Sequence, residues 1–207
     1  MTNKTVSTQT ITYFLGKTDM YLIDLLQKGY FNNQLHILDA GCGMGRNLWM
    51  LAKLGHTLIG IDQNEIAIKS LNNEINRLKM DQNISARVGE LDNLPFTDKE
   101  FDFVICNAVL HFAKDVSQFE LWFAEIVRVV KPQGVVFLRF VSSHTMDDSK
   151  SWNQVVNLPD GSTRFVVNES WLKEYLIPRY NLIYSEEFKT VNVANKRTMT
   201  TLVLRAK

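Results

Sequence analysis

Short apolar segments and longer amphipathic segments alternate along most of the chain. The short ones predict strands over residues 34–39, 57–62, 83–88, 101–107 and 135–141. The longer ones repeat apolar residues at three- and four-residue spacing and predict helices over 18–28, 44–54, 64–80 and 116–130. Strands that alternate with helices pair in parallel through right-handed crossovers. The pattern therefore predicts an α/β fold with a mostly parallel sheet.

The last third of the chain departs from this alternation. Residues 142–168 are polar and irregular, and they are longer than a usual connection, which indicates a functional or mobile segment. A short helical pattern follows over 169–176 and ends before Pro178. Two β-rich segments, 182–191 and 198–205, have no helix between them, so they predict an antiparallel hairpin that turns near Asn195.

Composition excludes several classes of protein. The 207 residues are 45% hydrophobic and 11% aromatic, enough to bury a substantial core. The net charge is +1 and no basic run occurs, so we expect no binding to nucleic acid. No apolar stretch approaches the roughly 20 residues that span a bilayer, and the first ten residues lack an apolar signal core. The cysteines, Cys42 and Cys106, have no metal-binding or paired spacing, which favours free thiols in the cytoplasm.

A glycine cluster directly follows the first predicted strand. Residues 38–47 read Leu-Asp-Ala-Gly-Cys-Gly-Met-Gly-Arg-Asn. Gly41, Gly43 and Gly45 let the backbone turn and pass close to a ligand, and a helix beginning near Met44 would point its free N–H groups at the same place. The spacing is not the G-x-G-x-x-G of dinucleotide-binding enzymes. Asp39 would repel a pyrophosphate but suits a ligand that carries an ammonium and a sulfonium.

Acids follow three predicted strands in succession. Asp39, Asp62 and Glu90 would reach the carboxyl edge of a parallel sheet, where ligands of such folds bind. Asp62 lies where a carboxylate can accept from both hydroxyls of a ribose, and Glu90 could accept from the exocyclic amine of a base. Each acid alone fits a solvated loop equally well, but their shared register with the glycine loop favours a ligand site.

These motifs together resemble the class I S-adenosylmethionine-dependent methyltransferases, with a more distant likeness to the tellurite-resistance type. The resemblance is carried by 38–45, by Ile-Gly-Ile-Asp at 59–62, by 88–96, by 101–111 and by 125–134. It implies a Rossmann-like three-layer sandwich with a seven-stranded sheet and an antiparallel C-terminal hairpin. On this basis we expect one domain over 1–207, with a helical cap over 1–33 and a substrate-side insertion at 142–168.

The resemblance also implies a binding set for the cofactor S-adenosyl-L-methionine. Asp39 would help to hold the ammonium, Asp62 the ribose hydroxyls, and Glu90 with the Leu91 amide the adenine edge. Asn107 would lie beside the methionine moiety. The full set of expected cofactor-binding residues is Asp39, Gly41, Cys42, Gly43, Gly45, Asp62, Gln63, Glu90, Leu91 and Asn107. Glu90 stands where relatives more often carry Asp, and Gln133 replaces a usual glycine.

Methyl transfer from a sulfonium needs mainly alignment of the acceptor, the methyl and the sulfur. His111, just beyond the fourth strand, is the candidate general base, although a histidine that only packs at a helix start fits the pattern as well. No spacing indicates a metal site. The sequence after the fourth strand lacks the prolines of adenine-N6 methyltransferases. Neither cysteine follows a proline, as the nucleophile of cytosine-C5 methyltransferases does. A small-molecule acceptor is therefore expected. Its contacts are expected to come from Tyr13, Phe14, Arg139, His144 and Trp152. We also expect the protein to be a monomer or a homodimer.

Two other classes stay open. A nicotinamide-dependent oxidoreductase also places glycines and a distal acid at a sheet edge, but the glycine spacing and Asp39 argue against it. A cofactor-binding module without turnover is the second alternative, because methyl transfer has no obligatory catalytic residue to look for.

Overall fold

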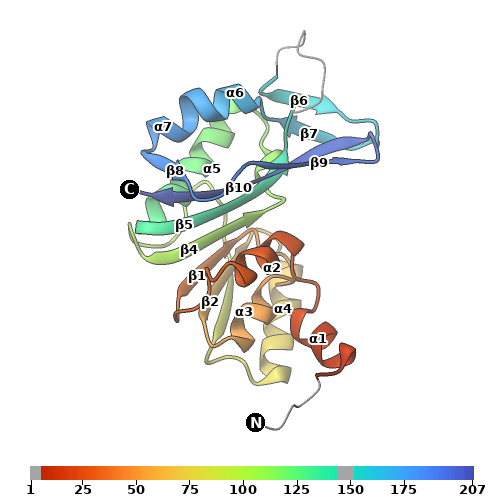
Figure 1. Cartoon of the computed structure of the whole chain (residues 1–207), viewed down its shortest axis with the longest axis vertical. Helices are drawn as coiled ribbons and strands as arrows, with labels where there is room; N and C mark the ends of the chain where they lie inside the picture. Colours follow the sequence, from red (N-terminus) through yellow and green to blue (C-terminus); the bar gives the residue numbers. More distant parts are fainter. Residues whose placement is uncertain (1–5, 144–151) are drawn as a thin grey trace. The chain divides into compact units, whose positions relative to one another are not determined.

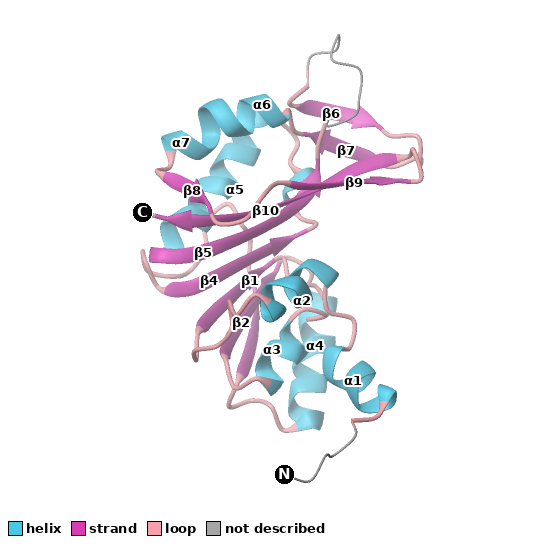
Figure 2. Ribbon diagram, in the orientation of Figure 1, coloured by secondary structure: helices cyan, strands magenta, loops and turns pink. Residues whose placement is uncertain are grey.

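The computed structural model describes residues 6–143 and 152–207. The chain divides into two compact units, residues 1–88 and 89–207. Helices and strands alternate in the first unit, and the second unit holds most of the antiparallel structure (Figure 1, Figure 2).

The first unit is built on three parallel strands. Strands β1 (His36–Ala40), β2 (Thr57–Asp62) and β3 (Ile84–Val88) pair in the order β3-β2-β1. Helix α3 (Leu48–Lys53) connects β1 to β2, and α4 (Glu65–Leu78) connects β2 to β3. Helix α4 buries the apolar stripe that the sequence predicts, including Leu71 and Ile75. The unit therefore brings the carboxyl ends of β1 and β2 side by side, with Asp39 opposite Gly60 in the register.

Two helices precede β1. Helix α2 (Met20–Gln27) occupies the predicted segment and begins at the Asp19 N-cap, whose carboxylate accepts from the Tyr21 amide. Helix α1 (Thr8–Leu15) was not individually predicted, and none of its residues is buried. It is attached to α3 by Lys53, whose ammonium donates to the Tyr13 carbonyl at 2.6 Å.

The second unit contains a mixed sheet. Strand β4 (Phe101–Asn107) pairs in parallel with β5 (Val130–Val141), and β10 (Arg197–Ala206) pairs antiparallel with β5. Strands β8 (Leu182–Tyr184) and β9 (Lys189–Val193) both pair antiparallel with β10. The predicted C-terminal hairpin is confirmed: it turns at Ala194 and Asn195, which both have positive φ. The predicted segment 182–191 is divided between β8 and β9.

Helix α5 (Val116–Val129) lies against this sheet, and a short helix packs on it. Phe119 of α5 is in edge contact with Phe140 of β5, with ring centroids 5.9 Å apart. Phe119 also contacts Trp171 of α6 (Glu169–Trp171). A π-helical turn over Leu172–Leu176 leads into α7 (Ile177–Arg179). A 3₁₀ turn, η1 (Leu110–Phe112), connects β4 to α5.

Four local predictions are corrected by the structure. The helix after the glycines begins at Leu48, not near Met44, because Gly43 and Gly45 have positive φ, which a right-handed helix does not allow. Strand β5 begins at Val130, directly after α5, and not at Val135 as predicted, because Val130 pairs with Phe101. Residues 131–134 then bulge out, and the pairing resumes between Phe103 and Val135. The segment 142–168 is not wholly irregular: β6 (Gln154–Asn157) and β7 (Thr163–Val166) form an antiparallel pair within it.

The helical segment near residue 176 also continues farther than predicted. Pro178 lies in the first turn of α7, where its missing N–H costs no helical hydrogen bond. Among the residues that the structure describes, no helix has both the length and the apolar character needed to cross a membrane.

Candidate functional site

The glycine loop, residues 41–47, is fixed to the end of β2 by backbone hydrogen bonds. The amides of Gly41 and Cys42 both donate to the Ile61 carbonyl, at 2.8 and 3.0 Å. Gly41, Gly43 and Gly45 all have positive φ, so all three predicted turn glycines are needed for conformation. A Cβ at Gly43 would meet no atom within 4 Å, whereas one at Gly45 would lie 2.6 Å from Leu71 Cδ1. Gly43 therefore borders open space, and Gly45 packs on the core.

The Asp62 carboxylate holds this loop directly. Its Oδ2 accepts from the Gly43 amide at 2.8 Å, and its Oδ1 accepts from the Asn64 amide at 2.9 Å. A carboxylate offers about four lone-pair positions, so each oxygen of Asp62 can accept one further hydrogen bond. The two remaining positions suit a pair of neighbouring hydroxyl donors beside Gly43. The sequence predicted that Asp62 accepts from the hydroxyls of a ligand, but it gave no sign that Asp62 holds the glycine loop.

Asp39 is a buried acid at the end of β1. Its side chain is 1% exposed, and neither carboxylate oxygen has a hydrogen-bond partner among the described residues. The pKa of Asp39 is raised from 3.8 to about 7, mainly by burial and to a smaller degree by the nearby Asp62 charge, while Arg46 and Asn47 oppose the shift. Native proteins rarely leave such a group unsatisfied, so this carboxylate fits a ligand that brings a cation with hydrogen-bond donors.

A small network supports the loop from the side of α2. Asn47 accepts from the Asp19 amide at 3.1 Å, and Arg46 lies 3.7 Å from the Asp19 carboxylate. Asp19 is itself 4% exposed. The N-cap of α2 is therefore tied to the glycine loop, which links the predicted N-terminal cap to the site. Periodicity alone gave no indication of this link.

The remaining predicted residues of the first unit have different environments. Cys42 is buried, and its thiol donates weakly to the Gly43 carbonyl with an S···O distance of 3.6 Å. Burial and the charges of Asp39 and Asp62 raise the pKa of this thiol well above its ordinary range. Gln63 follows β2 and is exposed. The short helix α3 begins at Leu48, three residues after Gly45.

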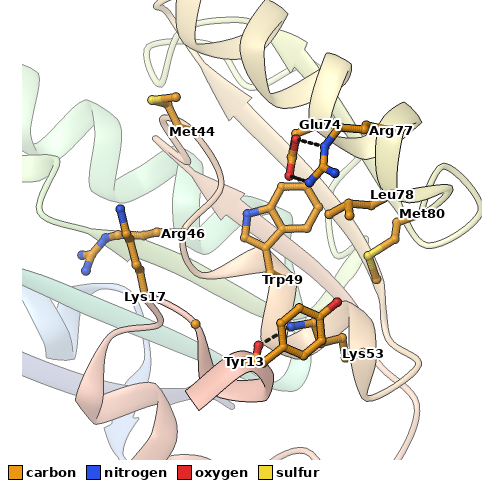
Figure 3. A pocket seen from close by; sticks show the side chains of 11 residues that line it. Tyr13, Lys17, Met44, Arg46, Trp49, Lys53, Glu74, Arg77, Leu78 and Met80 are labelled. Atoms are coloured by element: carbon orange, nitrogen blue, oxygen red, sulfur yellow. Dashed lines mark hydrogen bonds and ion pairs between the residues drawn. The ribbon is translucent and has the colours of Figure 1, made fainter. Parts of the chain in front are cut away.

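A cavity of about 650 Å³ lies on the first unit next to the glycine loop (Figure 3). Residues of α1, α3 and α4 line it, including Tyr13, Trp49 and Arg77. The ammonium of Lys53, which also lines the cavity, lies over the Tyr13 ring, 4.0 Å from its centre. Met44 and Arg46 of the glycine loop also line this cavity, whereas Asp39 and Asp62 do not. Tyr13, predicted to contact substrate, belongs here.

In the second unit, Glu90 and Leu91 begin the loop before β4. Glu90 is exposed and Leu91 is buried. Farther along this loop, Glu125 of α5 accepts from the Leu94 amide at 2.8 Å, and Arg128 donates to the Phe96 carbonyl at 2.8 Å. The loop is thus anchored by side chains of α5.

Asn107 and His111 lie at and just beyond the carboxyl end of β4. Each is 6% exposed, and both amide atoms of Asn107 and Nδ1 of His111 have no hydrogen-bond partner among the described residues. Burial, followed by the charges of Arg164, Arg197 and Arg139, lowers the pKa of His111 from 6.5 to about 4. The imidazole is therefore neutral near pH 7. It can accept a proton in principle, but its basicity is weak.

The other predicted substrate contacts are divided among several places. Arg139 lies in β5, and the partly buried Trp152 packs against the cluster formed by Val141 and Met199. Phe14 lies in α1 of the first unit. His144 lies outside the described residues. The structure thus brings together Asp39, Asp62 and the glycine loop in one unit, and Asn107, His111 and Arg139 in the other.

About half of the chain is similar in sequence to known methyltransferases. Residues 38–138 match the family model described as a methyltransferase domain. An uncharacterised methyltransferase of Bacillus subtilis is 31% identical over 112 residues, which are 54% of this chain and 46% of that protein. A ubiquinone biosynthesis O-methyltransferase of Rickettsia prowazekii is 31% identical over 121 residues, 57% of this chain and 45% of that protein. The chain spans about half the length of the curated relatives it matches.

Solved structures agree on the fold. A structure of an S-adenosylmethionine-dependent methyltransferase from Methanosarcina mazei superimposes with a TM-score of 0.70 at 22% identity, covering 87% of this chain and 96% of that one. The glycine loop, the strand-end acids and β4 all lie within the matched residues 38–138. Residues 38–138 therefore match a methyltransferase domain, and the chain shares the fold of the solved structures that superimpose on it.

Proposed function

We propose that this chain is an enzyme that transfers a methyl group from S-adenosyl-L-methionine to a small-molecule acceptor, mainly by positioning. The observation that carries the proposal is the buried, unpartnered carboxylate of Asp39 beside a glycine loop held by Asp62. The cofactor carries an ammonium group, which would supply the missing donors to Asp39, and two ribose hydroxyls, which can donate to the positions that Asp62 leaves open.

The residues of the first unit divide the cofactor between them. Asp39 receives the ammonium, because a cation is the partner that stabilises its ionised form inside the protein. Asp62 accepts from the ribose hydroxyls with the lone pairs that Gly43 and Asn64 leave open. Gly41, Gly43 and Gly45 allow the backbone to approach the cofactor closely. Cys42 and Gln63 complete the contacts of this unit.

In the second unit, Glu90 and the Leu91 amide are proposed to read the adenine edge, and Asn107 to contact the methionine part. The proposal for Asn107 is supported by its buried amide, whose donor and acceptor atoms have no partner among the described residues. The sulfonium supplies an activated methyl group, and orientation of the acceptor can supply on the order of 7–11 kcal/mol of the barrier.

Several features support a small acceptor. The net charge of +1 lacks the basic surplus typical of nucleic-acid-binding proteins. The ubiquinone biosynthesis relative is an O-methyltransferase that acts, by its name, in the synthesis of a small molecule. A cytoplasmic location and a monomeric or homodimeric state are part of the same proposal.

Binding and turnover test the proposal in two steps. Calorimetry should show S-adenosylmethionine binding and no binding of NADH, and Asp39→Ala and Asp62→Ala should each weaken the former. Binding of NADH instead would favour the oxidoreductase. An acceptor screen with methyl-labelled cofactor should then yield a labelled product. Tight cofactor binding with no transfer to any acceptor class would favour a binding module without turnover.

A further inference from the structure

A row of polar side chains crosses three adjacent strands of the second unit. Asn107 of β4 pairs in register with Arg139 of β5, and Arg139 pairs with Thr201 of β10. Register partners carry their side chains on the same face of a sheet. Asn107 and Thr201 are 6% and 2% exposed. A buried sheet face is normally apolar, so a polar row at its centre requires a reason.

The β6–β7 hairpin covers this same face. Val141 and Met199, each two residues from a member of the row, pack against Val166 of β7. Arg164 lies two residues before Val166 and therefore projects to the same side of the hairpin. Its guanidinium carbon lies 4.6 Å from the centre of the Phe112 ring, directly beside His111. Arg164 is thereby brought to the end of β4.

A third arginine comes from β10. Arg197 lies four residues before Thr201 and shares its face of the sheet. It pairs with Asp160 at 2.8 Å through one terminal nitrogen, while its buried Nε has no hydrogen-bond partner among the described residues. Trp152, which packs over Val141 and Met199, likewise has a buried indole N–H without a partner there. We call Arg139, Arg164 and Arg197 the arginine cluster.

The field of the arginine cluster is positive at His111. All three guanidinium groups act, after burial, to lower the pKa of this histidine. The carboxylate of Asp160 pairs with one of them. Three cations from three strands therefore act on one buried imidazole, which favours a bound negative charge there.

The neighbouring hydrogen-bonding groups point to the same ligand. Nδ2 of Asn107, Nδ1 of His111 and Oγ1 of Thr201 are buried and have no partner among the described residues. Each of these groups can donate a hydrogen bond, His111 in the appropriate tautomer. Buried polar atoms in native proteins are almost always satisfied by protein, water or ligand. Donors combined with guanidinium groups match the oxygens of an anion.

We propose that the arginine cluster with Asn107, His111 and Thr201 forms the acceptor subsite, and that the methyl acceptor carries a carboxylate or phosphate group. This inference rests on the proposed methyl transfer and names the class of its substrate. The arginines hold the anionic group and so orient the nucleophile, and His111 contributes a neutral hydrogen-bonding group beside it.

Binding of simple anions tests the subsite without any turnover. The His111 ring should be titrated by NMR with added acetate or inorganic phosphate, against chloride at the same ionic strength. A bound anion offsets the arginine charges, so it should raise the pKa of His111 from its low value. The rings of His36 and His56, both in the first unit, are internal controls and should not respond. A response to acetate alone identifies a carboxylate site, and one to phosphate alone a phosphate site.

Arginine variants assign the effect to the arginine cluster. Arg164→Gln and Arg197→Gln should each weaken anion binding about tenfold or more, the usual scale for losing a charge-assisted hydrogen bond. Arg179→Gln is the matched control, because Arg179 pairs with Glu120 and Tyr175 on a partly exposed surface. With an acceptor in hand, the cluster variants should raise its KM more than they lower kcat.

The outcomes separate this inference from the proposed function. If neither anion shifts the His111 titration in the wild type, the anionic subsite is wrong, even where S-adenosylmethionine binds and neutral acceptors are methylated. If anions bind but S-adenosylmethionine does not, the methyltransferase proposal fails instead. A purely structural role of the arginines predicts lower stability of the variants with unchanged anion affinity, which would also overturn the inference.

Discussion

The backbone amide of Gly43 donates a hydrogen bond to the carboxylate of Asp62, with an N···O distance of 2.8 Å. The acid that ends β2 thus fixes the loop that follows β1. This hydrogen bond fixes the loop without a ligand, so we expect little ordering entropy to be lost if the loop binds one.

We expect Asp62→Ala to weaken S-adenosylmethionine binding by one to a few kcal/mol, about tenfold or more, through loss of charge-assisted hydrogen bonds. The amide of Gly43 should also exchange faster with solvent. The fold should survive, because Asp62 is partly exposed. Calorimetry measures the first effect and hydrogen exchange the second. Asp81→Ala, an exposed acid in a turn of the same unit, should leave both unchanged. An affinity within twofold of the wild type would remove Asp62 from the site.

Gly43→Val should abolish cofactor binding while the protein remains folded. The new side chain would enter the open space beside Gly43 and adopt an unfavourable positive φ of 54°. Gly55→Val is a matched control, since Gly55 has a φ of 89° and equally open surroundings at the end of α3. Both variants should lose comparable stability in denaturant unfolding. Only the first should lose binding, and equal affinities in the two would contradict the position assigned to the loop.

Asp39 should make the stability of the protein depend on pH. Its pKa is about 7 in the folded state, against 3.8 for an unperturbed aspartate, so the folded protein keeps a proton that the unfolded chain releases. The free energy of unfolding should therefore fall as pH rises from about 4 to 7, by a few kcal/mol in total. Asp39→Asn removes this dependence and should be more stable than the wild type at pH 8. Denaturant unfolding at pH 5 and pH 8 measures the difference, and parallel pH profiles would exclude the raised pKa.

Cofactor binding should couple to the same proton. A cation beside Asp39 stabilises its charged form, so affinity for S-adenosylmethionine should rise as pH increases from about 5.5 to 7. Calorimetry in buffers of different ionisation enthalpy should detect release of a proton on binding. Asp39→Asn should bind more weakly, with an affinity that is nearly flat over this range. Proton uptake by the wild type would contradict the pairing of Asp39 with the ammonium.

His111 is expected to act by hydrogen bonding and positioning. Because its pKa is lowered to about 4, the wild-type kcat/KM should show no acidic limb near the ordinary histidine value of about 6.5. His111→Gln should raise KM for the acceptor and lower kcat less than the roughly 10²–10⁴-fold typical of a lost general base. A loss of that size, with a limb near pH 6.5 that disappears in the variant, would identify His111 as the base.

The sequence predicted the strands well where burial decides the structure. Strands β2 and β4 occupy the predicted residues because each is mainly apolar and ends at a polar side chain. Helix α1 was not individually predicted because it buries no residue, so no apolar stripe marks it. The β6–β7 hairpin was overlooked for a similar reason: its first strand is almost wholly exposed, and its pairing depends on the sheet it covers.

The candidate site was predictable only as far as chain position determines it. The carboxyl ends of neighbouring parallel strands meet at one edge, so Asp39 and Asp62 could be grouped from the sequence. The hydrogen bond between Gly43 and Asp62 depends on the exact turn of the loop, which spacing does not define. The arginine cluster joins residues of three strands separated by more than two dozen positions, and no local pattern connects them.

Asp39 has one further consequence for turnover. The ammonium that it is proposed to bind is unchanged by methyl transfer, because only the sulfonium loses its methyl group and its charge. Asp39 would thus bind the cofactor and its demethylated product equally, which is uniform binding and lowers KM without raising kcat. The same carboxylate that secures the cofactor would then retain the spent product, so we expect product inhibition and slow product release.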